Sequence, residues 1–208
     1  MLGVYDFNGH YDWTFAWLED LGGQAALDDY WDVAISQDSQ IHARQQFQRG
    51  LAGMVDYWGH TLAEEGAGYT SEVTRNPRTG RKLMRIDMHA CPSMGFLVHN
   101  GIGFSSDYCN HCVGWIGPAL TEAGFELDHE HDHAAHCWWE IRESSDHTPP
   151  TEAGELAAAD VRLLPTWSAQ SVHCYRRSQG PVTTDAPTGQ DVPNNGQEDA
   201  GMMKCDDC

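Results

Sequence analysis

Cysteine and histidine side chains crowd into one quarter of this chain, between residues 87 and 142. Four of the seven cysteines and seven of the twelve histidines in the 208-residue sequence lie there. They are Cys91, Cys109, Cys112 and Cys137, with His89, His99, His111, His129, His131, His133 and His136. Thiolate and imidazole groups serve best as soft metal ligands, nucleophiles or bases near neutral pH. We therefore expect the chain to fold around one reactive or metal-binding site built from this stretch.

Length and composition indicate one globular unit with a tail. At 208 residues, of which 40% are hydrophobic, the chain is long enough to bury its own core. We assign residues 1–178 to a single α+β domain that carries the Cys/His site within 87–142. Residues 179–208 are rich in Pro, Gly, Asn, Gln, Thr and Asp, and they end in Cys205-Asp206-Asp207-Cys208. This composition predicts a flexible acidic tail.

The charge of the chain excludes two classes of partner. A formal charge of −19 with only two lysines repels nucleic acids and anionic membranes. No run of about 18 apolar residues is present, and the N-terminus lacks the basic and apolar regions of a signal peptide. We therefore expect a cytoplasmic protein whose partner is a small-molecule substrate. In a reducing compartment, clustered cysteines bind metals or react more often than they form disulfides.

The N-terminal half is predicted to be helical. Large apolar residues spaced by four predict a short helix over 13–21, ended by Gly22-Gly23, with its aromatic side chains in the core. A second helix is expected over 24–35. A third is expected over 38–65, because one apolar stripe continues from Phe47 to Leu62.

The middle of the chain is predicted to form strands. Residues 69–75 and 82–89 flank an Asn-Pro-Arg-Thr-Gly turn at 76–80, which is typical of a hairpin. Alternation within 82–89 predicts one buried face and one polar face. Two more strands are expected over 125–132 and 136–142. Together these segments predict a helical N-terminal half packed on a small, mostly antiparallel four-stranded sheet.

The cysteines have the spacing of a tetrahedral metal site. Pro92 ends a strand just after Cys91, and a helix that begins near residue 107 carries Cys109 in its first turn. Cys112 follows three residues later on the same helix face. This C-x-x-C pair puts two sulfurs within reach of one ion, and Cys91 and Cys137 could complete a four-sulfur site.

Histidines offer alternative ligands for the same ion. His129, His131 and His133 alternate with acidic residues, so on a strand their imidazoles would share one face. One of them could replace a cysteine in the metal site. Zinc is the expected metal, iron or copper could take its place, and a metal-free site stays open.

A nucleophilic role for the cluster is the other interpretation. The field of the helix N-terminus favours a thiolate at Cys109. A histidine would then act as its base, and Asp107 or His111 could orient groups or relay protons. The sequence does not decide whether Cys109 attacks a substrate or holds a metal.

Several short motifs in this stretch resemble those of one enzyme family. A strand ends in Met88-His89-Ala90-Cys91-Pro92, and Tyr108-Cys109 follows. Next come Gly117-Pro118, Gly124-Phe125 and His136-Cys137-Trp138-Trp139. At these residues the chain resembles the L-2-amino-thiazoline-4-carboxylic acid hydrolase-like family.

The resemblance spans roughly residues 10–143. It implies a small α+β protein and hydrolytic opening of a thiazoline ring, with Cys91, Cys109 and Cys137 at the family-type positions. The chain departs from that pattern at Cys112, where an acidic residue is expected, and the extra histidines favour metal binding.

These observations lead to one expected function and one alternative. We expect a small-molecule hydrolase or lyase that acts on a C–N or C–S bond through a metal-containing Cys/His site. The alternative is a non-enzymatic metal-binding or redox-sensing domain. The sequence leaves the substrate and the oligomeric state open.

Overall fold

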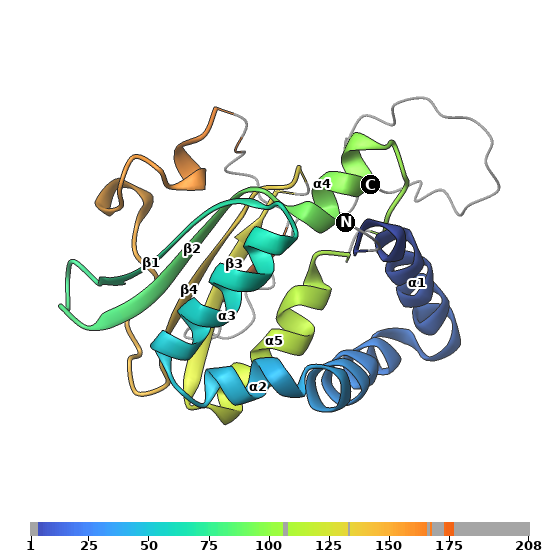
Figure 1. Ribbon diagram of the computed structural model, residues 1–208, viewed down its shortest axis with the longest axis horizontal. Helices are drawn as coiled ribbons and strands as arrows, with labels where there is room; N and C mark the ends of the chain where they lie inside the picture. Colours follow the sequence, from blue (N-terminus) through green and yellow to red (C-terminus); the bar gives the residue numbers. More distant parts are fainter. Residues whose placement is uncertain (1–3, 106–107, 133, 166, 168–172, 177–208) are drawn as a thin grey trace.

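The computed structural model describes residues 4–105, 108–132, 134–165, 167 and 173–176. The predicted α+β architecture is confirmed: helices of the N-terminal half pack on an antiparallel sheet with the order β1-β2-β4-β3-β5 (Figure 1). The strands are β1 (Gly68–Arg75), β2 (Lys82–Ala90), β3 (Phe125–His131), β4 (Cys137–Glu143) and β5 (His173–Arg176). The four predicted strands all form, and the short β5 adds to the edge of the sheet beside β3. The predicted acidic tail, 179–208, lies outside the described residues.

The β1–β2 hairpin forms because its turn residues satisfy the backbone locally. The side-chain Oδ1 of Asn76 accepts hydrogen bonds from the backbone N–H groups of Arg78 (2.9 Å) and Thr79 (3.2 Å). Gly80 adopts a φ of 71°, a left-handed conformation that glycine reaches without strain. The turn fixes the register of the two strands and directs β2 toward Cys91.

The helical half contains more breaks than its apolar pattern indicates. It consists of α1 (Val4–Asp29), a π-helix (Tyr30–Ser39), α2 (Ile41–Phe47) and α3 (Leu51–Glu64). Gly23, with a φ of 66°, interrupts α1 where the sequence predicts a helix end. The predicted single helix over 38–65 is wrong. Gly50, with a φ of 74°, donates to the carbonyl of Phe47 and accepts from Met54, so it ends α2 and starts α3.

No helix in the described part of the chain is long and apolar enough to cross a membrane.

Two hydrophobic cores hold the fold together. The larger core lies between the sheet and the helices α3 and α5 (Asn110–Glu122), which cover one sheet face (Figure 1). Its buried side chains include Phe47, Met54, Trp58, Met84, Ile86, Leu120, Leu127, Trp139 and Ile141. The smaller core joins α1, the π-helix and α4 (Pro92–His99), and it consists of Phe15, Leu27, Trp31, Met94, Leu97 and Tyr108. Cys91 packs against both cores.

The first helix turns an unexpected face to the core. Phe15 is only 2% exposed, whereas Trp13 and Trp17 are 55% and 49% exposed and stack on each other. The prediction that the aromatic side chains of α1 all lie in the core is therefore wrong for these two. Both residues lie on the other side of the helix from Phe15, which is the residue that contacts Trp31.

The second face of the sheet is also buried, although the sequence predicts a polar, solvated surface there. Arg85 and Asp87 on β2 are 2% and 6% exposed, and Glu140 on β4 is fully buried. The segment after β4 covers them: Asp160 accepts from Arg85 at 3.0 Å, and the backbone N–H of Thr151 donates to Glu140. The Asp160 carboxylate, 75 residues after Arg85, and the backbone N–H group of Thr151, 11 residues after Glu140, replace the water that would otherwise solvate this face.

Candidate functional site

Four cysteines from α4, α5 and β4 gather near the starts of α4 and α5. Figure 1 shows the start of α4 at one end of the sheet. Cys91 immediately precedes α4, Cys109 precedes α5, Cys112 lies in the first turn of α5, and Cys137 starts β4. All four are free thiols at intermediate exposure. They lie close enough that Cys91, Cys112 and Cys137 each raise the pKa of Cys109. The cysteines that crowd in the sequence thus also cluster in space.

The four cysteines are protonated, neutral thiols near neutral pH. Burial is the largest cause that raises the pKa of each of the four cysteines, and neighbouring thiols raise it further. The pKa values of Cys109 and Cys137 are raised well above the ordinary 9.0. The predicted stabilisation of a Cys109 thiolate by the α5 N-terminus is therefore outweighed by burial. A reaction at this cluster needs a base to remove a proton.

His111 supplies that base to Cys112. Its Nε2 lies 3.5 Å from the Cys112 Sγ, and its Nδ1 contacts the backbone carbonyl oxygen of Tyr108. A carbonyl oxygen can only accept, so Nδ1 carries the hydrogen and Nε2 is the free acceptor that faces the thiol. Burial lowers the pKa of His111, which keeps the ring neutral. This imidazole thus faces Cys112, whereas the sequence predicts Cys109 as the nucleophile.

The alternating histidines extend the site along the sheet. His131 lies directly opposite Cys137 in the β3–β4 register, and His129 lies opposite Trp139. Both histidines are buried, at 3% or less exposure, and their ring centroids are 5.5 Å apart. They share the sheet face that carries Cys137, as their alternation predicts. His133 and Asp107, the other predicted site residues, lie outside the described residues.

The described side chains contain no ready-made metal site, and the predicted ligand His133 lies outside them. Across the described residues, no group of three or more His, Cys, Asp or Glu side chains is arranged to hold a metal ion. A tetrahedral zinc site requires all of its sulfur ligands at about 2.3 Å from the ion, and in the deprotonated form. Each of the four cysteines has a raised pKa, so a metal ion would have to displace the proton of every thiol that binds it.

Hydrogen bonds of the turn between β3 and β4 hold Cys91 and Cys137 in place. Asp132 accepts hydrogen bonds from His136 Nδ1 at 2.7 Å and from the backbone N–H groups of Ala134 and His136. The turn then presents the carbonyl of Ala135 to the backbone N–H of Cys91, at 2.8 Å. This links the start of α4 to the start of β4. The alternation of acidic residues and histidines was visible in the sequence. The hydrogen bonds by which Asp132 holds the turn were not.

Tyr108 is a site residue that the chemistry of the sequence did not single out. Its carbonyl holds His111, and its hydroxyl lies 2.5 Å from the Ser93 hydroxyl in the first turn of α4. Burial is the largest cause that raises the Tyr108 pKa, and the thiols Cys112 and Cys91 raise it further. The hydroxyl therefore stays protonated beside the thiol cluster. The Tyr108-Cys109 pair, already part of the family resemblance, is the sequence signal that could have indicated it.

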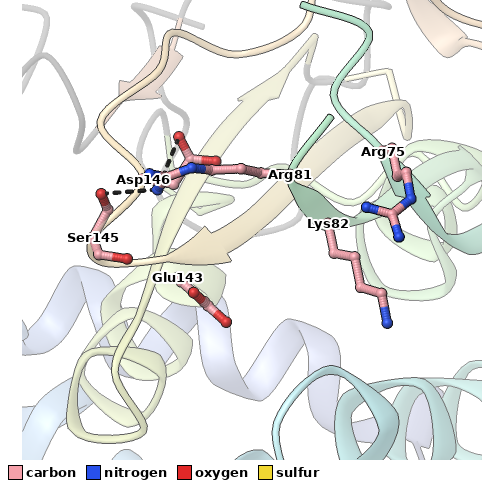
Figure 2. A pocket seen from close by; sticks show the side chains of 6 residues that line it. All are labelled: Arg75, Arg81, Lys82, Glu143, Ser145 and Asp146. Atoms are coloured by element: carbon pink, nitrogen blue, oxygen red, sulfur yellow. Dashed lines mark hydrogen bonds and ion pairs between the residues drawn. The ribbon is translucent and has the colours of Figure 1, made fainter. Parts of the chain in front are cut away.

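A separate hollow lies at the far end of the sheet from the thiols. It has a volume of about 390 Å³, and Figure 2 shows the side chains that line it: Arg75, Arg81, Lys82, Glu143, Ser145 and Asp146. Arg81 donates to the carbonyl of Ser145 at 3.1 Å. The nine residues of β2 separate this hollow from Cys91, a span of roughly 30 Å. It combines basic and acidic groups at the surface and shares no residue with the thiol cluster.

Comparisons with known proteins assign no family to this chain. No protein-family model, no curated protein and no solved structure matches it. The resemblance to the thiazoline-carboxylate hydrolase-like family therefore stays a prediction carried by short motifs.

Proposed function

We propose that this protein is a thiol-dependent hydrolase or lyase that cleaves a C–N or C–S bond of a small molecule. Cys112 is the nucleophile and His111 is its base. The observation that carries this proposal is the 3.5 Å contact between Cys112 Sγ and His111 Nε2, in an imidazole whose other nitrogen is held by the Tyr108 carbonyl. A nucleophile, a base and a group that orients the base are the recurring parts of such sites.

The chemical step follows from the resting protonation states. Cys112 rests as a thiol, because burial raises its pKa, and His111 rests neutral. The thiol proton moves to Nε2 while Sγ bonds to the electrophilic carbon of a C=N or C=O group. The π electrons move to the nitrogen or oxygen. His111 then returns the proton to the departing nitrogen or sulfur, and water hydrolyses the intermediate bound to the enzyme.

A cytoplasmic location agrees with this chemistry. Cys91, Cys109, Cys112 and Cys137 are all free, and free clustered thiols persist in reducing compartments. The formal charge of −19 disfavours nucleic acid and anionic membranes as partners. We therefore keep a small-molecule substrate as the proposed partner.

The test uses the thiazoline carboxylate of the resembled family as substrate. Ring opening at the C–S bond releases a new thiol, which a thiol-reactive dye detects. We expect turnover by the wild type, a loss of about 100-fold or more in Cys112→Ser and His111→Phe, and retention of activity in Cys109→Ser. Equal loss in Cys109→Ser would return the nucleophile to Cys109. Absence of turnover with every thiazoline, amide and thioester tried would oppose the enzyme.

A non-enzymatic metal-binding or redox-sensing domain is the second candidate. The closeness of the four thiols favours it, because each thiol that loses its proton would raise the pKa of its neighbours. A soft cation such as zinc, iron or copper would relieve that repulsion if the cluster tightened. Elemental analysis of protein purified without a chelating tag tests this idea. One equivalent of metal, lost in the Cys109→Ser/Cys112→Ser double variant, would support it.

A further inference from the structure

A buried amide from α1 reaches the start of α4. Asn8 is 3% exposed, and its Oδ1 accepts from the Ser93 hydroxyl at 3.3 Å. Its Nδ2 has no hydrogen-bond partner among the described residues. The great majority of buried hydrogen-bond donors in folded proteins have an acceptor. An unpaired one beside a candidate catalytic site therefore calls for a ligand atom to accept from it.

Hydrogen bonds connect Asn8 to the thiol cluster in a fixed direction. The amide Oδ1 can only accept, so Ser93 donates its hydrogen to Asn8. Ser93 must then accept from the Tyr108 hydroxyl, 2.5 Å away. The Tyr108 ring lies edge-on to the His111 ring, with 4.9 Å between the ring centroids, and His111 Nε2 is 3.5 Å from Cys112 Sγ. Tyr108, Ser93 and Asn8 thus form a short chain that begins beside His111, the base of Cys112, and ends at an unpaired N–H group.

The start of α4 adds to the polarity of this region. Cys91 occupies the N-cap position of α4, and the backbone N–H groups of Met94, Ser93 and Gly95 oppose the rise in its pKa. Backbone N–H groups at a helix start carry a partial positive charge. A negative charge that forms on a substrate next to Asn8 therefore meets a favourable field as well as a free donor.

We propose that Asn8 is a catalytic residue of the thiol site, an inference that rests on the proposed function. When Cys112 Sγ bonds to a carbonyl or imine carbon, the π electron pair moves onto the oxygen or nitrogen, and the thiol proton goes to His111. The Nδ2–H of Asn8 donates to that oxygen or nitrogen as it gains charge. Ser93 and Tyr108 hold the amide in place. The site therefore selects substrates whose reacting carbon bears a C=O or C=N group.

Two thiol reagents separate this role from a structural one. Addition of a cysteine to acrylamide places negative charge on the carbonyl oxygen of the reagent, whereas exchange with methyl methanethiosulfonate places none there. Both rates are measured at Cys112 by peptide mass spectrometry of the intact, full-length protein. Asn8→Leu removes both ends of the amide, and Asn8→Asp keeps the acceptor for Ser93 but removes the donor. Asn100→Leu, at the exposed end of α4, is the matched control.

We expect both Asn8 variants to slow acrylamide addition at Cys112 by roughly tenfold or more, with the methanethiosulfonate rate unchanged within about twofold. Asn100→Leu should change neither rate. A parallel change of both rates in either Asn8 variant would show that Asn8 only holds α1 against α4, and would overturn the proposal. Unchanged rates would overturn it too. His111→Phe is tested separately, in a protein that keeps Asn8. If this variant reacts at Cys112 as fast as the wild type with both reagents, the proposed nucleophile–base pair fails, and that outcome is distinct from the failure of the role of Asn8.

Discussion

Replacement of Arg85 by methionine tests whether the second sheet face is held by charge. Arg85 is 2% exposed, and its guanidinium lies 2.6 Å from Asp87, 3.0 Å from Asp160 and 3.4 Å from Glu140. It also stacks on the Trp138 ring, with 4.6 Å to the ring centroid. Methionine retains the apolar stem of the side chain but leaves the buried carboxylates with one cation fewer.

The expected loss follows from which carboxylates keep a partner. Asp160 still pairs with Arg162 at 2.7 Å, and Glu140 stays 3.6 Å from Arg142. Asp87 has no second ion-pair partner in the described part of the chain. Leaving one buried charge uncompensated costs about 3–5 kcal/mol. That is a large part of the roughly 5–15 kcal/mol that stabilises a typical domain.

The loss should depend on pH in a defined direction. Burial raises the pKa of Asp87 above its ordinary value of 3.8, and Arg85 lowers it. Removing Arg85 therefore raises the folded-state pKa of Asp87 further above its unfolded value. Ionised Asp87 then destabilises the fold above that raised pKa, and the penalty disappears as the pH falls through it. Arg85→Met should thus lose more stability at pH 7 than at pH 5.

Urea denaturation followed by tryptophan fluorescence measures the free energy of unfolding at both pH values. Arg49→Met is the control, because its ion pair with Asp56 is 3.1 Å long but both side chains are more than half exposed. That pair should contribute about 0–1 kcal/mol at either pH. If Arg85→Met costs no more than Arg49→Met, or costs the same at pH 5 and pH 7, charge pairing does not hold this face.

Three further outcomes follow from other parts of the structure. Because burial lowers the pKa of His111 below its ordinary 6.5, acrylamide addition at Cys112 should stay constant as the pH falls from 8 to about 6.5 and decline only below that, measured as a pH–rate profile. Gly50→Ala places a side chain at a φ of 74°, which should cost roughly 1–2 kcal/mol and lower the melting temperature without changing the rate at Cys112. At Gly114 a Cβ would overlap the Trp31 ring, so Gly114→Ala should cost about 1–3 kcal/mol; an unchanged melting temperature would contradict the packing of α5 on the π-helix.

The sheet was predictable from local sequence, and the break between α2 and α3 was not. The hairpin follows from turn residues that act within five positions, such as Asn76 and Gly80. The apolar stripe, in contrast, continues in phase across Gly50, from Phe47 to Met54. A periodic pattern therefore reads as one helix, although the backbone changes hand at a single residue.

The buried charges and the details of the site could not be predicted from the sequence, because they depend on contacts between residues far apart in the chain. The polarity of Arg85 predicts exposure, since nothing near it in the sequence indicates that Asp160 lies 75 positions further on to pair with it. Crowding of cysteines and histidines indicated where the site lies. Which thiol His111 serves depends on side-chain direction in the first turn of α5, and Asn8 lies more than 80 positions from Ser93, so neither could be read from spacing.

Cys91 packs against both hydrophobic cores, and this gives the thiol site an unusual mechanical position. The smaller core joins α1 and α4, and the larger one joins the sheet to α3 and α5. A small separation of these two bodies would widen the space around the thiols while leaving the interior of each intact. Local openings of this kind need less free energy than global unfolding, and amide hydrogen exchange detects them. Opening along the boundary between the two cores would then set how fast a small molecule reaches the thiols.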